Sequence, residues 1–579
     1  MKNRDLRISE PSRIEMSYES PVFETSSKIG VMYRQAQELT HIYNESHDRP
    51  LSAANVHICA VLHLIYQTVI SAYLKGTDSD PFSRIQVLAQ KNEACKEVLG
   101  FYNRMFPTKL TDQRFDGLDE TARAFFVHQV FESNPAFLTA TGNMFDQSTM
   151  VFPQGTKALT GMMGRYLKGT SFIENTESDD LFSFLTMPSR LFPDSLLKQM
   201  EYITEHWDML LPEELNTLLL KAKDYLREET KPHPMGPGPG PMEIPSFKDE
   251  YQDFEMFTPD KNWMPNVVMM AKSTLVWLDQ LSKKYERDIS RLDQIPDEEL
   301  DYLRDSGFTA LWLIGLWERS PASKKIKVLC GNPDAESSAY SLKGYEISSR
   351  IGGWQSLYDL KKRCWERGIR LASDMVPNHT GIDSDWMMEH SDYFIQQSYP
   401  PFPSYTYNGP NLSDNPDIDI RIEDHYYDRT DAAVTFRRVD RRTGETSYIF
   451  HGNDGTTMPW NDTAQLDFLN PTTREAVIQQ ILEVARNFPV IRFDAAMTLA
   501  KRHIQRLWYP KPGTGGDIAG RIPYEMTDEE FNRRIPNEFW REVVDRISQE
   551  LPDTLLIAEA FWMMESYFVR TLGMHRVYN

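Results

Sequence analysis

The chain has 579 residues, of which 40% are hydrophobic and 25% charged, so neither wholesale disorder nor a collagen-like repeat fits. Its 84 acidic and 63 basic residues give a net charge of −21, which disfavours general binding to nucleic acids and anionic membranes. Four widely spaced cysteines form no CxxC pair, which excludes a zinc ribbon. The first 13 residues are mostly charged and polar, so we expect no signal peptide and a cytoplasmic location.

Residues 1–230 predict an all-helical N-terminal domain. Apolar residues recur at helical spacing in Val31–Tyr43, Val56–Leu74, Thr121–Phe131 and Leu215–Leu226. The most apolar of these segments, Val56–Leu74, is interrupted by two histidines and by other polar residues. We therefore interpret it as a buried helix and not as a membrane span. This domain shows no recognisable motif.

Residues 231–261 predict a linker. The segment Lys231–Pro241 alternates proline and glycine, so neither a helix nor a strand persists there. A phosphate-binding loop is excluded because prolines lack the backbone N–H groups that a phosphate needs. We place the domain boundary in this extended segment.

Residues 262–579 alternate between short apolar runs and amphipathic helices. An apolar run at Ser273–Leu278 comes first, and the expected strands that follow it are Phe308–Ile314, Ile369–Val376, Val490–Asp494 and Leu555–Glu559. The expected helices are Pro296–Arg304, Trp354–Arg367, Thr472–Arg486 and Glu538–Leu551. This repetition predicts a parallel sheet covered by helices, either a (β/α)8 barrel or a doubly wound sheet. The first strand is not followed by GxGxxG, which disfavours a nucleotide-binding enzyme.

One connection in this region is too long for a simple loop. Roughly ninety residues separate the Ile369–Val376 strand from the Thr472–Arg486 helix, far more than a usual βα connection. They are rich in tyrosine, aspartate, proline and asparagine. We expect an inserted subdomain at residues 383–463.

Acidic and basic residues stand where three successive strands end. These endings are Asp374, Asn378 and His379; Arg492 and Asp494; and Glu559. The carboxyl ends of barrel strands meet at one mouth. Neighbouring strands lie about 4.8 Å apart, so carboxylates ending two of them are expected at roughly 5–5.5 Å, the separation found in retaining glycosidases.

The surroundings of the two carboxylates suggest different roles. Arg492 lies two residues before Asp494, so both side chains point to the same side and the guanidinium favours an ionised aspartate. Glu559 follows the apolar run Leu555–Ala558, where burial raises the pKa of a carboxyl as a general acid requires. The pattern indicates a nucleophile and an acid/base.

These residues resemble the motifs of the α-amylase superfamily, also known as glycoside hydrolase family 13. The matching segments are Asp374–His379, Val490–Ala495, Ile557–Glu559, Gly344–Glu346 and Gln465–Asn470. They follow the order and spacing of the family, and the resemblance covers about residues 262–579. It implies a (β/α)8 barrel with an inserted domain B.

The resemblance also implies roles for individual residues. Asp494 corresponds to the nucleophile, Glu559 to the acid/base and Arg492 to the nucleophile's partner. His379 and Tyr345 correspond to residues that bind the sugar at the cleavage site. The corresponding enzymes cleave α-1,4-glucans, so the expected partner is an α-glucan or a maltooligosaccharide.

Three further residues are assigned lesser roles. Asp374 corresponds to a supporting residue of the first motif, and Trp562, which adjoins the third motif, is a candidate for stacking on a glucose ring. Asn378 corresponds to an asparagine that helps hold a structural Ca²⁺ in many family members. We expect no required cofactor, and the resemblance leaves a structural Ca²⁺ open. The acidic run Asp414–Asp419 offers further oxygen ligands, although we favour an acidic strand face there.

Two departures from the family leave alternatives open. Met497 and Thr498 stand where many amylases carry Lys-His, so acceptor binding differs and the choice between hydrolysis and glycosyl transfer stays open. The sequence ends on about the sixth strand, from which we expect an incomplete barrel, truncated before the fourth motif. The alternatives to an α-amylase-like hydrolase are a glucanotransferase or isomerase of the superfamily, and a non-catalytic α-glucan-binding protein or inactive fragment.

Overall fold

The computed structural model divides the chain into two compact units. A helical unit comprises Met1–Lys231 with Pro512–Gly515, and an α/β unit comprises Pro232–Lys511 with Gly516–Asn579. The structure describes residues 6–7, 22–23, 31–46, 50–77, 80–106, 118–145, 152–168, 178, 180–230, 255–456, 458–561 and 564–578. Most of the predicted linker, residues 231–254, lies outside this set.

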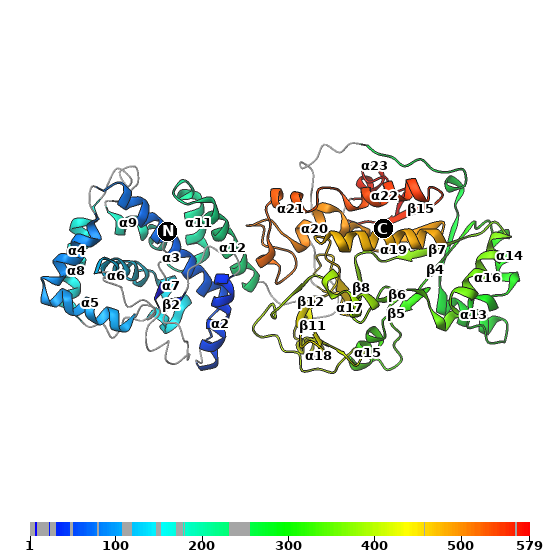
Figure 1. The fold of residues 1–579 in the computed structure, drawn as a ribbon, viewed down its shortest axis with the longest axis horizontal. Helices are drawn as coiled ribbons and strands as arrows, with labels where there is room; N and C mark the ends of the chain where they lie inside the picture. Colours follow the sequence, from blue (N-terminus) through cyan, green and yellow to red (C-terminus); the bar gives the residue numbers. More distant parts are fainter. Residues whose placement is uncertain are drawn as a thin grey trace. The chain divides into compact units, whose positions relative to one another are not determined.

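The helical unit contains helices over all four segments predicted from apolar spacing (Figure 1). Its longer helices are α2 (Val31–Ser46), α3 (Ala53–Lys75), α4 (Pro81–Gln90), α5 (Glu93–Met105), α6 (Leu118–Glu132), α8 (Pro153–Tyr166), α11 (Leu196–His206) and α12 (Glu213–Thr230). Shorter helices are α7 (Pro135–Thr141), α9 (Leu181–Leu185) and α10 (Met187–Leu191). A two-residue antiparallel pair, β1 (Leu6–Arg7) with β2 (Val22–Phe23), departs from the all-helical prediction.

Helix α3 forms the centre of this unit. The side chain of Ser52 caps its start by accepting a hydrogen bond from the backbone N–H of Asn55. By length and composition, α3 is apolar enough to cross a membrane, and 78% of its most apolar window is buried inside the protein. Its residues Cys59, Leu62 and Tyr66 belong to the core of the helical unit. The predicted buried helix is therefore present.

The α/β unit is built on a six-stranded parallel sheet in the order β16-β15-β14-β7-β4-β3. The strands are β3 (Met269–Ser273), β4 (Ala310–Ile314), β7 (Arg370–Met375), β14 (Val490–Phe493), β15 (Leu555–Glu559) and β16 (Arg576–Tyr578). The connecting helices include α13 (Thr274–Lys284), α14 (Asp297–Asp305), α16 (Gly353–Trp365), α19 (Pro471–Asn487), α20 (Lys501–Trp508), α21 (Asp528–Arg534), α22 (Phe539–Glu550) and α23 (Glu565–Arg570). This is the predicted barrel with about six strands.

The apolar run Ser273–Leu278 lies mostly in helix α13, because the first strand is formed by the preceding residues Met269–Ser273. Trp277, Leu278 and Leu281 are buried at helical spacing and pack into the main core. A short apolar run is compatible with either a strand or a helix, and here the burial of one face shows that the run is helical.

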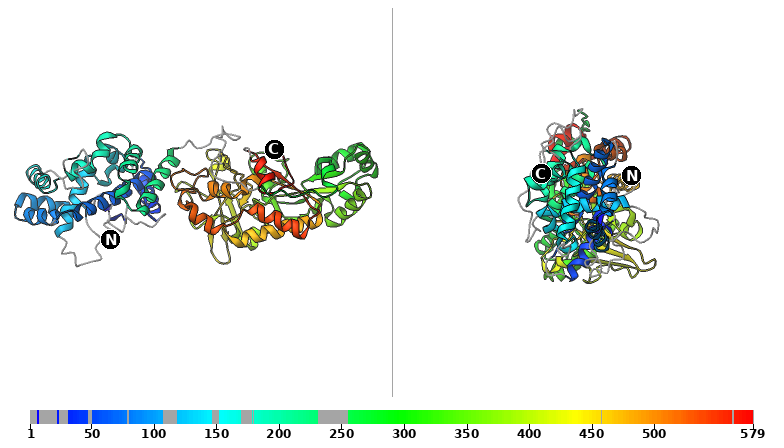
Figure 2. Two further views of the ribbon diagram at one scale, coloured as in Figure 1. Left: turned by 90° about the horizontal axis from the view of Figure 1, so that it is seen from above. Right: turned by 90° about the vertical axis from the view of Figure 1, so that its left-hand side faces the viewer.

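The sheet curls strongly, as in a barrel. In strand order, three strands separate β4 from β16. Even so, the rings of Trp312 on β4 and Tyr578 on β16 meet edge to face, with centroids 6.2 Å apart. Two further views of the ribbon are given in Figure 2. The curvature turns the side chains at the carboxyl ends of the strands toward one another.

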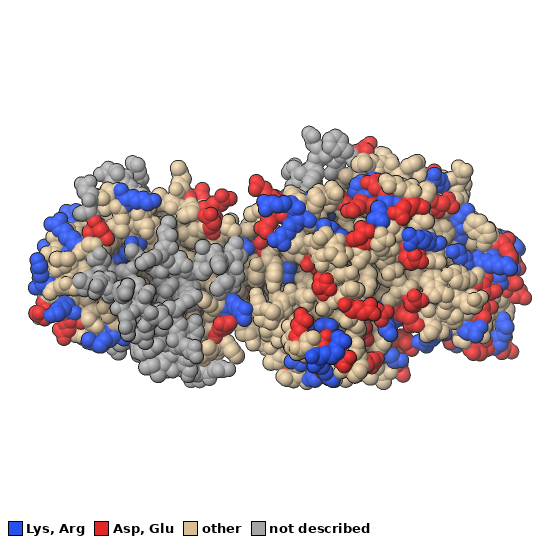
Figure 3. All heavy atoms as spheres, viewed as in Figure 1, with Lys and Arg blue, Asp and Glu red and all other residues tan. Residues whose placement is uncertain are grey.

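The predicted insert is a small antiparallel subdomain. Strands β9 (Gln396–Gln397), β10 (Ile418–Ile422), β11 (Thr435–Asp440) and β12 (Thr446–Phe450) form one sheet in the order β10-β11-β12-β9. At its base, β8 (His379–Gly381) pairs with β13 (Thr463–Gln465). The insert also contains the short helices α17 (Asp385–Glu389) and α18 (His425–Asp428). On the face in Figure 3, acidic and basic side chains of the α/β unit are interspersed and do not form one large patch of a single sign.

A buried amide pair in the helical unit provides a stability test. The side chains of Asn134 and Gln199 exchange two hydrogen bonds of 2.7 and 3.0 Å, and Gln199 also donates to the carbonyl of Phe192 at 2.8 Å. Gln199→Ala removes these three hydrogen bonds of buried groups, so we expect it to lower the free energy of unfolding by about 1–3 kcal/mol.

Urea unfolding followed by circular dichroism measures this effect. Gln90→Ala is the matched control, because Gln90 is exposed at the end of α4. A loss in Gln199→Ala no larger than in the control would contradict the structural role of the pair.

Candidate active site

The two candidate catalytic carboxylates stand next to each other at the ends of neighbouring strands. Phe493 on β14 pairs with Ala558 on β15, so the next residues, Asp494 and Glu559, are level with each other. Side chains alternate along a strand, and paired residues of a parallel sheet share a face. The sheet register therefore brings Asp494 and Glu559 together on the inner face.

Arg492 holds three carboxylates with one guanidinium group. Its Nη1 lies 2.6 Å from Oδ1 of Asp494 and 3.2 Å from Oδ1 of Asp374, and its Nη2 lies 2.8 Å from Oε2 of Glu559. Arg492 on β14 also pairs in register with Asp374 on the adjacent β7. The four residues predicted from three separate strand endings thus form one charged cluster.

Three aromatic rings surround the same guanidinium. The ring centroids of Trp312, Tyr340 and Tyr578 lie 5.6, 5.2 and 5.3 Å from its central carbon. The hydroxyl of Tyr578 accepts a hydrogen bond from Nε of Arg492 at 2.7 Å. Burial raises the pKa of Tyr578 to about 12, so this hydroxyl is neutral at pH 7. Sequence analysis missed these rings, since only the curl of the sheet brings them to Arg492.

Asp494 is 8% exposed, and this burial has an electrostatic consequence. Burial raises the pKa of Asp494, while the contact with Arg492 lowers it, and the net shift is upward. The guanidinium contact expected from the sequence is present. Its effect on the pKa of Asp494 is smaller than that of burial.

One oxygen of Glu559 has two partners. Its Oε2 accepts a hydrogen bond from the backbone N–H of Ala495 and forms an ion pair with Nη2 of Arg492, each at 2.8 Å. The side chain of Glu559 is 17% exposed, whereas that of Arg492 is 5% exposed. Glu559 is thus oriented by its neighbours and still reaches the surface of the site, as a group that transfers protons must.

Asp374 is a buried carboxyl deeper in the cluster. Its Oδ2 accepts a hydrogen bond from Nε1 of Trp312 at 3.1 Å. Burial raises the pKa of Asp374 to about 7, although Arg492 and Trp312 oppose this shift. Asp374 therefore carries a proton below about pH 7, which reduces the negative charge that Arg492 has to balance.

His379 is the first residue of β8, and Tyr345 lies within β6 (Leu342–Ile347). Burial lowers the pKa of His379 to about 4, so its imidazole is neutral at pH 7, and its ring lies 5.0 Å from that of Trp460. The hydroxyl of Tyr345 accepts from the backbone N–H of Val376 at 3.0 Å and donates to its carbonyl at 3.1 Å. Tyr345 thus fixes the backbone two residues beyond Asp374.

The residues considered for calcium are engaged with protein partners. The amides of Asn378 and Gln465 exchange hydrogen bonds of 2.9 and 3.2 Å. Asp414 pairs with Lys325 at 2.6 Å, and Asp419 pairs with Arg441 at 2.8 Å. In the part of the chain that the structure describes, no group of three or more His, Cys, Asp or Glu residues is arranged for a metal. These residues do not fit a calcium site as they stand. A structural Ca²⁺ stays a prediction, and no step below uses one.

Two further predicted positions, Met497 and Thr498, follow Asp494 closely in the sequence and are buried. Met497 and Thr498 are buried at 2% and 1% exposure, so neither is available to an acceptor sugar. The hydroxyl of Thr498 donates instead to the carbonyl of Ala495 at 2.7 Å. Trp562, the predicted stacking residue, lies outside the described residues.

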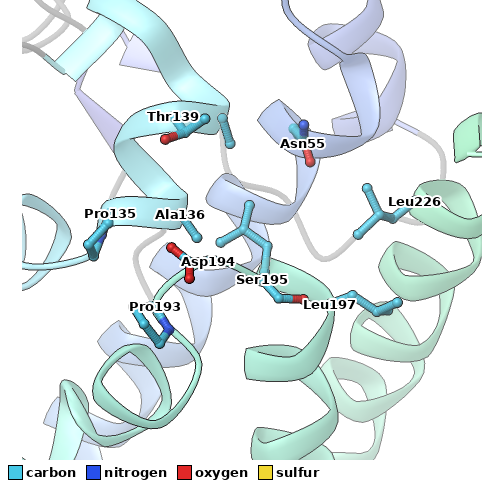
Figure 4. A pocket seen from close by; sticks show the side chains of 11 residues that line it. Asn55, Pro135, Ala136, Thr139, Pro193, Asp194, Ser195, Leu197 and Leu226 are labelled. Carbon is cyan, nitrogen blue, oxygen red and sulfur yellow. The ribbon is translucent and has the colours of Figure 1, made fainter.

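The helical unit contains a separate cavity of about 550 Å³ (Figure 4). Its walls are mostly proline, alanine and leucine, with polar groups from Asn55, Thr139 and Ser195. Among the described residues that line it, Asp194 is the one with an ionisable side chain, so these residues offer no pair of groups for acid–base chemistry. The strand-end cluster of the α/β unit is the better candidate active site.

The raised pKa of Asp374 predicts a pH dependence of stability. The folded protein holds a proton on Asp374 up to about pH 7, whereas an unfolded aspartate loses it near pH 4. The native state therefore binds more protons in this interval, and this contribution makes stability fall as pH rises from about 4 to 7. Asp374→Asn, which cannot ionise, is expected to remove that fall.

Thermal unfolding from pH 4.5 to 8 checks this expectation. The difference in Tm between Asp374→Asn and the unmodified protein should increase with pH and level off above about pH 7. A difference independent of pH would show that Asp374 does not hold a proton. Asp305→Asn, on the surface at the end of α14, serves as control.

Part of the α/β unit is similar to known proteins. Residues 291–489 match the family model "Alpha amylase, catalytic domain". A glucan 1,6-alpha-glucosidase of Streptococcus dysgalactiae subsp. equisimilis is 30% identical over 111 residues, 18% of this chain and 18% of that protein. The alpha-amylase mde5 of Schizosaccharomyces pombe is 24% identical over 213 residues, 37% of this chain and 33% of that protein.

A solved structure described as a family GH13_31 enzyme is 17% identical, with a TM-score of 0.35, over 55% of this chain and 52% of that one. The matched segments amount to a third or less of the lengths of the two sequence relatives named above. The family match spans β4, β7 and the whole insert, and it ends before β14. Residues 291–489 of the α/β unit are thus similar to the catalytic domain of α-amylases, and the parallel sheet with its strand-end residues agrees with this match.

Proposed function

We propose that this protein is a retaining glycoside hydrolase that cleaves α-1,4-glucans such as maltooligosaccharides. The observation that carries the proposal is the level arrangement of Asp494 and Glu559 on adjacent parallel strands, with Arg492 in contact with both. Adjacent strands are about 4.8 Å apart, and retaining enzymes hold their two carboxyl groups about 5–5.5 Å apart. An inverting enzyme needs a wider gap to admit water between the carboxylate and the sugar.

The proposed reaction has two steps. Asp494 attacks the anomeric carbon while Glu559 donates a proton to the departing glycosidic oxygen, so that a covalent glycosyl-enzyme forms and the leaving sugar departs as an alcohol. Glu559 then removes a proton from a water molecule, which attacks the same carbon and releases Asp494. Two displacements on one carbon return it to its original configuration.

Arg492 supports both steps through its charge. The guanidinium contacts the nucleophile at 2.6 Å and the acid/base at 2.8 Å, so it stabilises negative charge on whichever of the two carboxylates is ionised. Asp374 holds a proton below about pH 7 and then adds no third negative charge. Arg492 thus opposes the effect of burial on the ionisation of Asp494, although the net shift of the pKa of Asp494 is upward.

A glucanotransferase or isomerase of the same superfamily is the second candidate. It is favoured by Met497 and Thr498, which stand where many amylases carry Lys-His, so that acceptor binding differs. Both candidates form the same covalent intermediate and differ in the acceptor that attacks it. Product analysis on maltooligosaccharides separates them, since transfer yields longer oligomers and hydrolysis only shorter ones.

Substitution of the two carboxylates tests the assigned roles. We expect Asp494→Asn to lower turnover of maltooligosaccharides roughly 10³-fold or more, because the nucleophile is lost. Glu559→Gln is expected to lower it about 10²–10⁴-fold, because proton transfer is lost. Release of reducing sugar measures both effects, and circular dichroism confirms folding.

Asp545→Asn is the control for these substitutions, because Asp545 is a half-exposed residue on helix α22, away from the strand ends. Near-normal turnover in either Asp494→Asn or Glu559→Gln would overturn the assignment. Complete inactivity of the unmodified protein on α-glucans would instead favour a non-catalytic glucan-binding role.

The stereochemistry of the product provides an independent test. Because carboxylates at the ends of adjacent strands suit a double displacement, the sugar first released from an α-glucan should be the α-anomer. Proton NMR during the first minutes of the reaction detects the anomer before mutarotation mixes the two forms. Initial release of the β-anomer would exclude the proposed covalent intermediate.

A further inference from the structure

The residue that follows the proposed nucleophile has an unusual backbone. Ala495 adopts φ 46° and ψ 37°, the left-handed region that residues with a Cβ rarely occupy. Among the described residues, it is one of four non-glycine residues with positive φ; the others are Glu286, Arg429 and Ala433. Ala495 is 5% exposed, so a buried position beside the catalytic cluster retains a disfavoured conformation.

The amide of Ala495 leaves the usual pattern of the sheet. The preceding amide, that of Asp494, donates to the carbonyl of Met375 at 2.8 Å and so continues the pairing with β7. The next amide of a strand points to the opposite neighbour, here β15. The N–H of Ala495 donates a hydrogen bond of 2.8 Å to Oε2 of Glu559. Its acceptor is therefore a side-chain oxygen and not the backbone carbonyl that it would meet in a regular sheet.

The turn that presents this amide is fixed from its other side. The carbonyl of Ala495 accepts from both the hydroxyl of Thr498 at 2.7 Å and the backbone N–H of Thr498 at 3.1 Å. Thr498 is 1% exposed. Burial and these two hydrogen bonds compensate for the left-handed conformation.

We propose that the backbone amide of Ala495, held by this left-handed turn, positions Glu559 for proton transfer; the inference rests on the proposed function. Ala495 is thus a positioning residue that acts through Glu559. Ala495 connects the two carboxylate residues, because it directly follows Asp494 in the chain and donates a hydrogen bond to Glu559. A residue at this position has to accept positive φ, which β-branched side chains resist.

The leaving group of the substrate separates this role from a general disturbance of the site. A maltooligosaccharide needs a proton on its departing oxygen, whereas α-glucosyl fluoride loses fluoride with little help from an acid. We expect Ala495→Val to lower kcat/KM for maltooligosaccharides about 10²-fold or more, the contribution of a general acid, and to affect α-glucosyl fluoride less than about 5-fold. The ratio kcat/KM reports the first step alone, so the later role of Glu559 as a base does not interfere.

Two further variants test the backbone argument. Ala495→Gly accepts the same φ, so it should lose less than about 5-fold on either substrate. Thr498→Val keeps the shape of the side chain but removes the hydroxyl, so it should repeat the leaving-group dependence of Ala495→Val more weakly. Ala433→Val is the matched control, because Ala433 also has positive φ (50°) and is buried in the insert. It should lower Tm without changing the ratio between the two substrates.

Each result decides between the alternatives. Equal losses on both substrates in Ala495→Val would overturn the inference, because the residue would then act through Asp494. Unchanged rates would overturn it as well. If Ala495→Val fails to fold, as judged by circular dichroism, Thr498→Val provides the decision: an unchanged substrate ratio rejects the inference. A native protein inactive on both substrates would reject the proposed function itself, and this inference with it.

Discussion

The structure of the candidate site depends on one buried cation. The guanidinium of Arg492 contacts Asp374, Asp494 and Glu559, and these three residues come from three adjacent strands. Burying charged groups is costly unless they are paired, so none of these carboxylates is stable in this position without it. Removing Arg492 would leave several acidic groups close together with no compensating charge. The interaction therefore supports both the packing of the sheet and the chemistry at its edge.

The charge of the cluster is nevertheless unbalanced, and the structure relieves the imbalance in several ways. One guanidinium faces three carboxyl groups, of which Asp374 keeps its proton below about pH 7. Tyr578 and the backbone of Ala495 add uncharged donors and acceptors around the cluster. The rings of Trp312, Tyr340 and Tyr578 exclude water from the guanidinium and present their electron-rich faces to it. A low local dielectric strengthens each of these interactions.

Much of this site was predictable from the sequence, because the signals were local. Asp374, Arg492, Asp494 and Glu559 stand at the ends of apolar runs, and parallel strands bring such ends together. The aromatic rings were not predictable in this way, because Trp312 and Tyr578 meet only through the curvature of the sheet. The balance between burial and the Arg492 contact at Asp494 likewise depends on three-dimensional packing.

The fold shows the same division between local and non-local information. Helices were predicted where apolar residues followed a regular period, as in α3 and α19. The run Ser273–Leu278 was too short for the period to be recognised, so the strand that precedes it was missed. The left-handed turn at Ala495 has no sequence signal, since alanine usually adopts negative φ.

The way in which the insert is joined to the sheet allows its sequence to change independently of the candidate site. The short ladder between β8 and β13 closes the excursion at its base, so its two ends lie side by side whatever lies between them. Insertions and exchanges are tolerated where chain ends are held close together. Evolution is therefore free to replace the four-stranded sheet beyond this ladder without moving the carboxylates at the strand ends.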